Sequence, residues 1–257
     1  MMRKLAFVAA GIAGLLLGGA AASAADEEEP ALPKVHWSFE GPLGTFDRAA
    51  AQRGFQIYEE VCSRCHSLSL LHYGDLTGIG YSADEVKAIA STKQVTDGPN
   101  DQGEMFQRPG RASDKFVAPF ANEQAARAAL NGALPPDLSL IVKALEGGPS
   151  QVFGILTGYR DPPPPGFKLG DGMYYDLYFP GHQIAMPQPL AGSDVTYADG
   201  AKPTLEQEAQ DVVTFLAWAA EPTMEERKYT GTKVLIFLVF MTGLLFGAKR
   251  KIWADVH

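Results

Sequence analysis

The run VCSRCH, residues 61–66, decides how this chain folds, because it contains every cysteine of the 257-residue sequence. Two residues separate Cys62 from Cys65, and His66 follows Cys65 directly. Any thiol chemistry that contributes to the fold must therefore take place within residues 61–66. We call residues 61–66 the attachment turn.

The stretch before the attachment turn, TFDRAAAQRGFQIYEE, carries apolar residues at roughly helical spacing. Thr45 and Asp47 are both suitable caps for a helix that begins here. The sequence therefore predicts a helix that delivers Cys62 at its C-terminal end.

Three of the four interpretations of the cysteine pair meet an objection. A disulfide between Cys62 and Cys65 closes almost no loop and so stabilises the fold very little. A structural zinc site needs four protein ligands, and the chain has no second cysteine pair. A thioredoxin-like redox pair needs a βαβ context, which the sequence does not show. Of these three, the redox pair is the main alternative to the fourth interpretation, which is described next.

The fourth interpretation is one covalently bound haem c. In a Cys-x-x-Cys-His motif each thiol adds to one vinyl group of the porphyrin, and the adjacent histidine ligates the iron. The spacing of Cys62 and Cys65 matches the two vinyl groups on one porphyrin edge, and His66 then lies under the iron. We predict that Cys62 and Cys65 form the thioethers and that His66 is one axial ligand.

A methionine on the other face of the iron would give an electron carrier with a raised potential. Met186 is the favoured candidate, because two prolines stiffen the loop IAMPQP around it and remove competing donors. Met105 lies among polar residues and is expected on the surface, while Met173 is expected to pack against nearby aromatic residues. His182 is the other candidate sixth ligand, although the sequence favours the interpretation that it is a loop histidine that does not bind the iron.

The rest of the chain between the two ends predicts several short helices separated by long Gly- and Pro-rich loops. No β-alternation recurs. The expected helices and their caps are 82–91 with Ser82, 122–132 with Asn122, 137–148 with Asp137, 150–159 with Ser150, and 204–221 with Thr204. We predict a mainly α, c-type cytochrome domain with long irregular loops, organised by an embedded cofactor.

Both ends of the chain carry membrane-related signals. Residues 1–25 combine two basic residues, an apolar run and a small-residue tail, which is typical of a cleaved secretory signal peptide. The apolar run 234–248 gives about 22 Å of helix, less than the roughly 30 Å of a bilayer core. It is nevertheless apolar on all sides, has Tyr229 and Trp253 near its ends, and is followed by the basic cluster 249–251.

These signals predict three parts: a signal peptide at 1–25, a periplasmic haem domain at 26–226, and a transmembrane anchor with a short cytoplasmic tail at 227–257. The protein would then be a single-pass protein of a bacterial inner membrane. The domain at 26–226 has a net charge of −15. Such a charge repels nucleic acid and favours the approach of a basic protein partner.

Longer blocks of the sequence resemble the cytochrome c1 family, the haem c subunits of the cytochrome bc1 complex (ubiquinol–cytochrome c reductase). The resemblance covers nearly all of the chain after the signal and rests on the blocks QRGFQIYEEVCSRCHSL, NEQAARAALNGALPPDLSLIV, LTGYRDPP and YYDLYFPGHQIAMPQPL. It implies that Met186 is the sixth ligand and that residues 131–139 line the haem pocket. Many relatives carry a basic residue where this chain has Leu145, so a propionate contact at that position is not implied.

The resemblance also implies a function and a set of partners. The chain would accept an electron from the Rieske iron–sulfur protein and pass it to a soluble basic cytochrome c, beside cytochrome b in a dimeric complex in membrane lipid. By itself it would be a non-catalytic electron carrier. The alternative is a membrane-anchored monohaem cytochrome that serves a different oxidase or a photosynthetic reaction centre.

Overall fold

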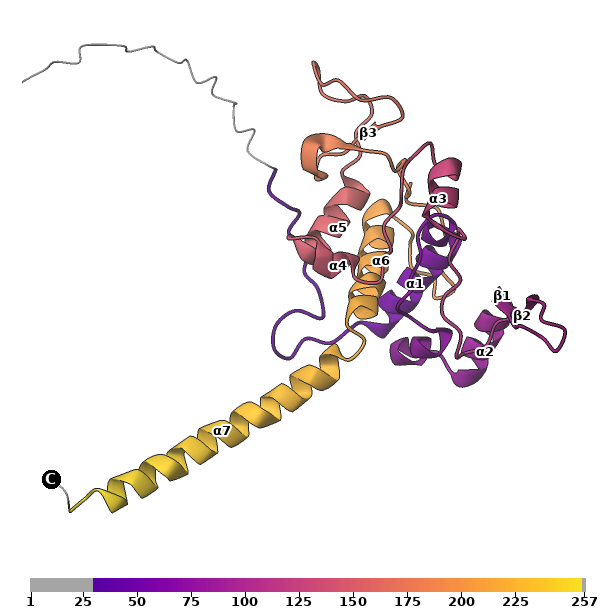
Figure 1. Ribbon diagram of the computed structural model, residues 1–257. Coiled ribbons are helices and arrows are strands. Elements are labelled where there is room, and N and C mark those ends of the chain that lie inside the picture. Colours follow the sequence, from indigo (N-terminus) through magenta and orange to yellow (C-terminus); the bar gives the residue numbers. More distant parts are fainter. Residues whose placement is uncertain (1–29, 256–257) are drawn as a thin grey trace, which may run out of the picture.

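The computed structural model describes residues 30–255, which form a helical head and one long projecting helix (Figure 1). The α-helices are α1 (Arg48–Glu60), α2 (Ala83–Ser91), α3 (Glu123–Ala129), α4 (Ile141–Ala144), α5 (Gly148–Thr157), α6 (Leu205–Ala220) and α7 (Met224–Ile252). Three 3-10 turns accompany them: η1 (Cys62–Arg64), η2 (Tyr73–Ile79) and η3 (Pro180–His182). The prediction of a mainly α protein with long irregular loops is confirmed.

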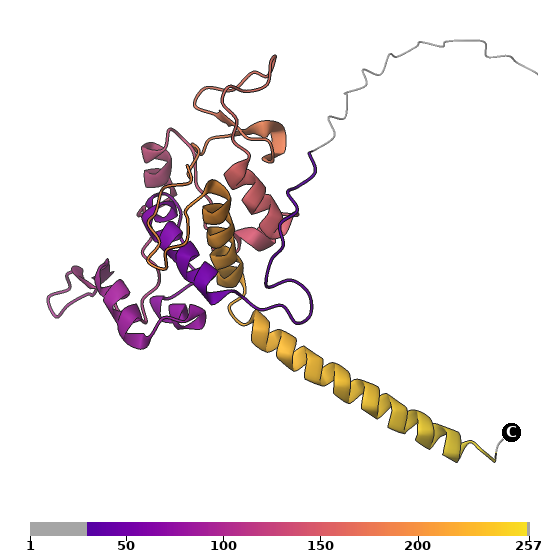
Figure 2. The same cartoon turned by 180° about the vertical axis from the view of Figure 1, so that it is seen from behind.

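The centre of the head is the pair α1 and α6, with α5 on the other side of α6 (Figures 1 and 2). Gly54 marks the point of closest approach, because a Cβ there would lie 2.0 Å from the Asp211 carbonyl oxygen. Beside it, Arg53 forms a bidentate pair with the fully buried Asp211, at 2.8 and 2.9 Å. This tight contact fixes the direction in which α1 delivers the attachment turn.

Four of the predicted caps are confirmed. Asp47 accepts from the N–H groups of Ala49 and Ala50 at the start of α1, which settles the choice between Thr45 and Asp47. Ser82 forms a reciprocal capping box with Glu85 at α2. The remaining two are Asn122 at α3 and Thr204 at α6.

Two predicted caps are wrong. Helix α4 begins only at Ile141, so Asp137 lies outside it and bonds to a distant segment instead. Helix α5 begins at Gly148, with Gly147 in the capping position, so Ser150 lies inside the helix. In the second case the Ser150 hydroxyl accepts from the Trp37 indole at 3.2 Å, a contact that the local sequence does not reveal.

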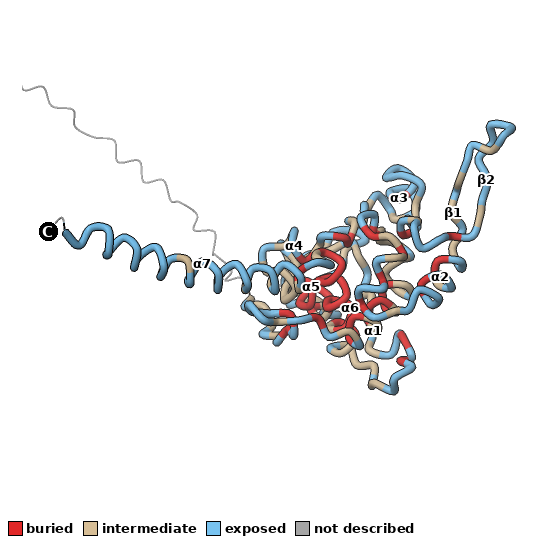
Figure 3. The backbone as a smooth tube through the Cα atoms, turned by 90° about the horizontal axis from the view of Figure 1, so that it is seen from below, coloured by how far each residue is buried: buried red, intermediate tan, exposed pale blue. Residues whose placement is uncertain are grey.

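Two short two-stranded sheets lie in loops that gave no β-pattern. Strands β1 (Gln94–Asp97) and β2 (Phe106–Pro109) pair antiparallel, with Val95 opposite Arg108. Strands β3 (Tyr174–Tyr175) and β4 (Gln183–Ile184) form a second antiparallel pair. The first pair extends outward and is largely exposed (Figure 3), whereas the second pair leads into the loop that carries Met186.

Helix α7 has 29 residues, which corresponds to about 43 Å of helix and removes the length objection raised by the apolar run alone. Its apolar window has a mean hydropathy of 1.9 and is not buried against the head (Figure 3). The first turn is fastened to the head, because Glu225 bonds to Arg48 at 2.6 Å and Lys228 donates to the Phe39 carbonyl at 2.6 Å. By length and composition α7 is suited to cross a membrane. The predicted signal peptide lies outside the described residues.

Candidate haem-attachment site

The attachment turn is a compact local structure at the end of α1. The N–H groups of Cys65 and His66 both donate to the carbonyl of Cys62, at 3.1 and 2.9 Å. The Tyr58 hydroxyl, on the last turn of α1, donates to the His66 carbonyl at 3.1 Å. The structure thus brings both cysteines and the histidine together on one turn, as the sequence predicts.

The imidazole of His66 is held by a backbone group from another segment. Its Nδ1 lies 2.8 Å from the carbonyl oxygen of Pro136. Since a carbonyl only accepts, Nδ1 carries the hydrogen and Nε2 keeps a free lone pair. Burial lowers the pKa of His66, which favours the neutral ring that a metal requires.

Asp137 locks the Pro136 segment onto the residues that follow the attachment turn. Its carboxylate accepts from the Ser67 hydroxyl at 2.7 Å, the Ser69 N–H at 2.8 Å and the Ser139 N–H at 2.8 Å. Burial opposes ionisation of this group, but the hydrogen bonds from Ser139, Ser67 and Ser69 outweigh it and lower the pKa of Asp137 to about 2. An ionised Asp137 therefore holds the carbonyl that orients His66.

A hollow of about 500 Å³ opens beside the attachment turn. Cys65 and Ser67 line one part of it, and Leu134, Pro135 and Pro136 line another. This places part of the block 131–139 beside a motif thiol, while its role as a lining of the haem pocket stays a prediction. The donor set also fits a haem: two unpaired thiols, an imidazole with a free Nε2, and an apolar wall containing two prolines.

The competing interpretations of the thiols find less support. Cys62 and Cys65 are not joined in a disulfide. No cluster of three or more His, Cys, Asp or Glu side chains suited to a metal ion occurs within residues 30–255. Burial raises the pKa of the Cys62 thiol to about 12, whereas the thiols of redox pairs have lowered pKa values.

Met186 lies in a segment without helix or strand between β4 and α6 and is half-buried. Within the described residues, no hydrogen bond joins it to the attachment turn. Its carbonyl accepts from the Tyr159 hydroxyl at 3.0 Å. Farther along, the same loop reaches α1, where Gln56 donates to the Thr196 carbonyl at 3.2 Å. Met186 as sixth ligand therefore stays a prediction.

His182 packs as an aromatic ring. It stacks on Tyr175, with ring centroids 5.8 Å apart, and meets the edge of Phe167 at 6.5 Å. Its backbone is in the left-handed region, with a φ of +56°. Met105 is 60% exposed, as expected of a surface residue.

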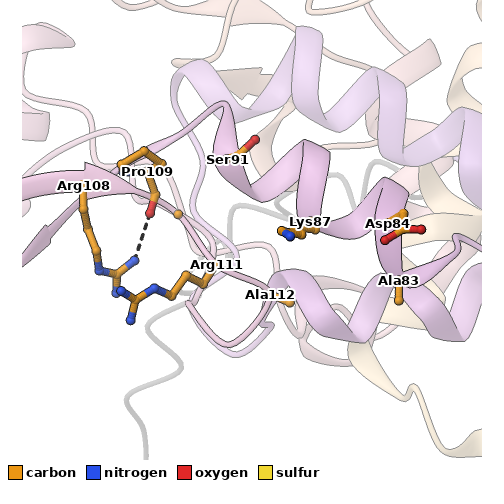
Figure 4. Close-up of a pocket in the computed structure, with 9 residues that line it drawn as sticks. Ala83, Asp84, Lys87, Ser91, Arg108, Pro109, Arg111 and Ala112 are labelled. Carbon is orange, nitrogen blue, oxygen red and sulfur yellow. Dashed lines mark hydrogen bonds between the residues drawn. The ribbon is translucent and has the colours of Figure 1, made fainter.

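A second hollow, of about 660 Å³, lies between α2 and residues 108–112 (Figure 4). Lys87 and Arg111 line it, and Arg108 at its edge pairs with Asp114 at 2.6 Å. None of the predicted haem residues lines this hollow, so we do not assign it to the same site.

Sequence reasoning missed the residues that hold the site residues in place. Asp137 was predicted as a helix cap, although the serines at 67, 69 and 139 are its partners. Tyr159 gave no signal, because its contact with Met186 spans 27 residues. Glu208 is fully buried in α6, where a helical pattern alone does not predict a carboxylate.

Comparison with known proteins finds relatives that match most of the chain. A family model described as Cytochrome C1 family matches residues 37–256. The chain is 52% identical to "Cytochrome c1 1, heme protein, mitochondrial" of Arabidopsis thaliana, over 92% of this chain and 77% of that protein. It is 44% identical to "Cytochrome c1" of Rhodospirillum rubrum, over 98% of this chain and 97% of that protein.

A third relative is longer. The chain is 47% identical to "Cytochrome b/c1" of Bradyrhizobium diazoefficiens over 98% of its own length, but it spans only 40% of that protein. The name of this relative joins cytochrome b and cytochrome c1 in one protein.

Proposed function

The chain belongs to the cytochrome c1 family, and we propose on that premise that it relays single electrons from the Rieske iron–sulfur protein to a soluble basic cytochrome c. As a family member it is a haem protein and the electron-transfer subunit of the cytochrome bc1 complex, in which it accompanies cytochrome b. The observation that carries the proposal is the attachment turn, with His66 held by the Pro136 carbonyl.

Different residues of the chain would attach the haem and ligate its iron. Cys62 and Cys65 would fix its position through thioether bonds, and His66 and Met186 would ligate the iron. When bound, the haem supplies a one-electron couple at its iron. The hydrogen bond to Pro136 orients His66 and keeps its Nε2 available as a ligand. A thioether ligand such as Met186 and an apolar enclosure both raise the potential.

We place the chain in a membrane by its exposed apolar helix α7. We propose cleavage of residues 1–25, a periplasmic haem domain at 26–226, and an anchor at 227–257 with its basic end in the cytoplasm. Because Glu225 and Lys228 fasten the start of α7 to the head, the haem domain would stay close to the bilayer. We also propose that the complex containing this chain is a dimer.

The acidic head supports docking of a basic cytochrome c. Attraction between opposite net charges weakens as salt shortens the screening length, from about 10 Å at 0.1 M to about 3 Å at 1 M. The second-order rate of cytochrome c reduction is therefore expected to fall steadily with ionic strength. A rate that does not change with salt would contradict electrostatic docking.

The ligand assignment is tested by Met186→Leu, with Met105→Leu as the matched control on the exposed hairpin. Both complexes should retain cytochrome b and covalent haem. In Met186→Leu the midpoint potential should fall and ferrous haem should bind carbon monoxide. Because each lowering of about 59 mV makes electron transfer from the Rieske protein to this haem tenfold less favourable at equilibrium, reduction of cytochrome c by the complex should fall.

Two results would count against these assignments. An unchanged potential in Met186→Leu would remove Met186 as a ligand. Purification of the haem subunit without cytochrome b, under conditions that preserve membrane complexes, would favour a cytochrome that serves another oxidase or reaction centre.

A further inference from the structure

We propose that Tyr159 and Glu208 are positioning residues for Met186, each fixing one end of the methionine segment (residues 186–194). The inference rests on the proposed ligand role of Met186. It adds two side chains, from separate parts of the head, that keep the thioether in one place.

The methionine segment contains no helix or strand, and its internal hydrogen bonds are the short-range ones made by the side chains of Gln188 and Asp194. Residues 185–204 contain neither helix nor strand, so their backbone groups need partners from elsewhere. Pro187 and Pro189 restrict the backbone but donate no hydrogen bonds. The direction of the Met186 side chain therefore depends on the contacts that hold the two ends of this segment.

Tyr159 holds the first end. Its hydroxyl donates to the carbonyl of Met186 itself, at 3.0 Å. The backbone around Tyr159 is fixed in turn, because it forms a bridge with Asp176 and the Arg160 N–H donates to the Tyr175 carbonyl at 3.3 Å. The bond thus connects Met186 to the end of α5 and to strand β3.

Glu208 holds the other end from α6. Its two carboxylate oxygens accept from the N–H of Asp194 at 2.9 Å and from the N–H of Gly192 at 3.1 Å. The side chain has no exposed surface. A buried carboxylate is costly unless its oxygens are hydrogen-bonded, and here both oxygens bind the backbone of the methionine segment.

The chain around Gly192 packs too closely on α6 to move freely. Gly192 has a φ of +85°, and a Cβ on it would lie 2.6 Å from the N atom of Leu205. Leu190 is 1% exposed and belongs to the central core. Once Glu208 binds Gly192 and Asp194, the segment between Met186 and Leu190 has a fixed end, and Tyr159 fixes its beginning.

The test uses the purified full complex and compares Tyr159→Phe and Glu208→Gln with matched controls. Tyr174→Phe changes a neighbouring exposed tyrosine, and Glu206→Gln changes an exposed carboxylate on the same helix. Met186→Leu is included to test the ligand itself. For each complex we would measure covalent haem content, the thioether-to-iron charge-transfer band, the midpoint potential, and carbon monoxide binding to ferrous haem.

Both test variants should keep the wild-type haem content, while the equilibrium between bound and unbound thioether shifts by roughly tenfold, as expected for one lost buried hydrogen bond. That shift should weaken the charge-transfer band, lower the potential, and increase the fraction of haem that binds carbon monoxide. The two control variants should match wild type. A general loss of stability would lower haem content without this selective change at the ligand.

The outcomes separate the two proposals. If Met186→Leu alters the potential while Tyr159→Phe and Glu208→Gln do not, the positioning roles are wrong and the ligand role stands. If Met186→Leu leaves the potential unchanged, the ligand role fails and this inference fails with it. Should Glu208→Gln lose haem altogether, Tyr159→Phe decides: a wild-type band in that variant overturns the proposal.

Discussion

The two faces of the proposed haem site are built in different ways. On the histidine face, residues 58–69 form one continuous local structure, and a single outside segment around Pro136 and Asp137 completes it. On the methionine face, the segment 186–194 has no regular structure and depends on side chains from the end of α5 and from α6. One face is determined mostly by neighbouring residues and the other by distant ones.

This difference suggests where each face is vulnerable. A change in the attachment turn should remove the haem function at once, because the groups that hold and ligate it are neighbours in sequence. The methionine face should lose its ligand in steps, as separate contacts such as those of Tyr159 and Glu208 are removed. The following substitutions probe that contrast, beginning with the largest expected effect.

His66→Ala should have the largest effect, because it removes the proposed axial ligand and leaves the Pro136 carbonyl without its partner. Reduction of cytochrome c by the complex should fall to background, and the haem spectrum should change. His36→Ala is the control, since its side chain is 99% exposed. A wild-type spectrum in His66→Ala would show that another group ligates the iron.

Asp137→Asn should weaken the histidine face by an intermediate amount. The amide keeps the shape of the carboxylate but loses its charge and part of its capacity to accept bonds from Ser67, Ser69 and the Ser139 N–H. We expect a loss of about 2 kcal/mol in the free energy of unfolding at neutral pH, the scale of hydrogen bonds to a charged group. Denaturant unfolding monitored by haem absorbance would measure it, with Asp101→Asn in the exposed hairpin as control.

The loss in Asp137→Asn should also depend on pH. The pKa of Asp137 is about 2 in the folded protein, below the ordinary aspartate value of about 3.9. Its stabilisation is therefore fully present above about pH 5 and is lost as the pH falls toward 2. The difference in stability between wild type and Asp137→Asn should shrink over that range, and a constant difference would count against an ionised Asp137.

Asp199→Asn should have the smallest effect of the series. The carboxylate of Asp199 meets Arg53 at 2.7 Å, but it is 46% exposed and Arg53 keeps its bidentate pair with Asp211. Exposed pairs contribute about 1 kcal/mol or less, so the midpoint of thermal unfolding should shift by less than about 4 °C. If the ferrous haem of Asp199→Asn bound carbon monoxide as strongly as that of Tyr159→Phe, the ion pair between Asp199 and Arg53 would also help to position Met186.

The sequence was most informative where structure depends on close neighbours. Ser82 and Glu85 cap α2 as predicted, because a capping box needs only residues three positions apart. The same is true of the attachment turn, where Cys62, Cys65 and His66 share one turn of chain. The long helix at the C-terminal end was also predicted from a continuous apolar run.

Features that depend on distant residues were missed or assigned wrongly. Asp137 resembled a cap in sequence, but its partners Ser67 and Ser69 lie about 70 positions away. The short strands β3 and β4 have two residues each, too few to show alternation. Glu208 resembles a surface residue of α6 until the loop that covers it is known.

The central claim, that both cysteines carry a haem, is tested most directly by mass spectrometry of the protein purified from its native membrane and denatured in acid. The account predicts that the peptide containing Cys62 and Cys65 carries the mass of one haem and resists thiol alkylation, with a haem c band in the pyridine haemochrome spectrum. A peptide of unmodified mass whose two thiols react freely would contradict it.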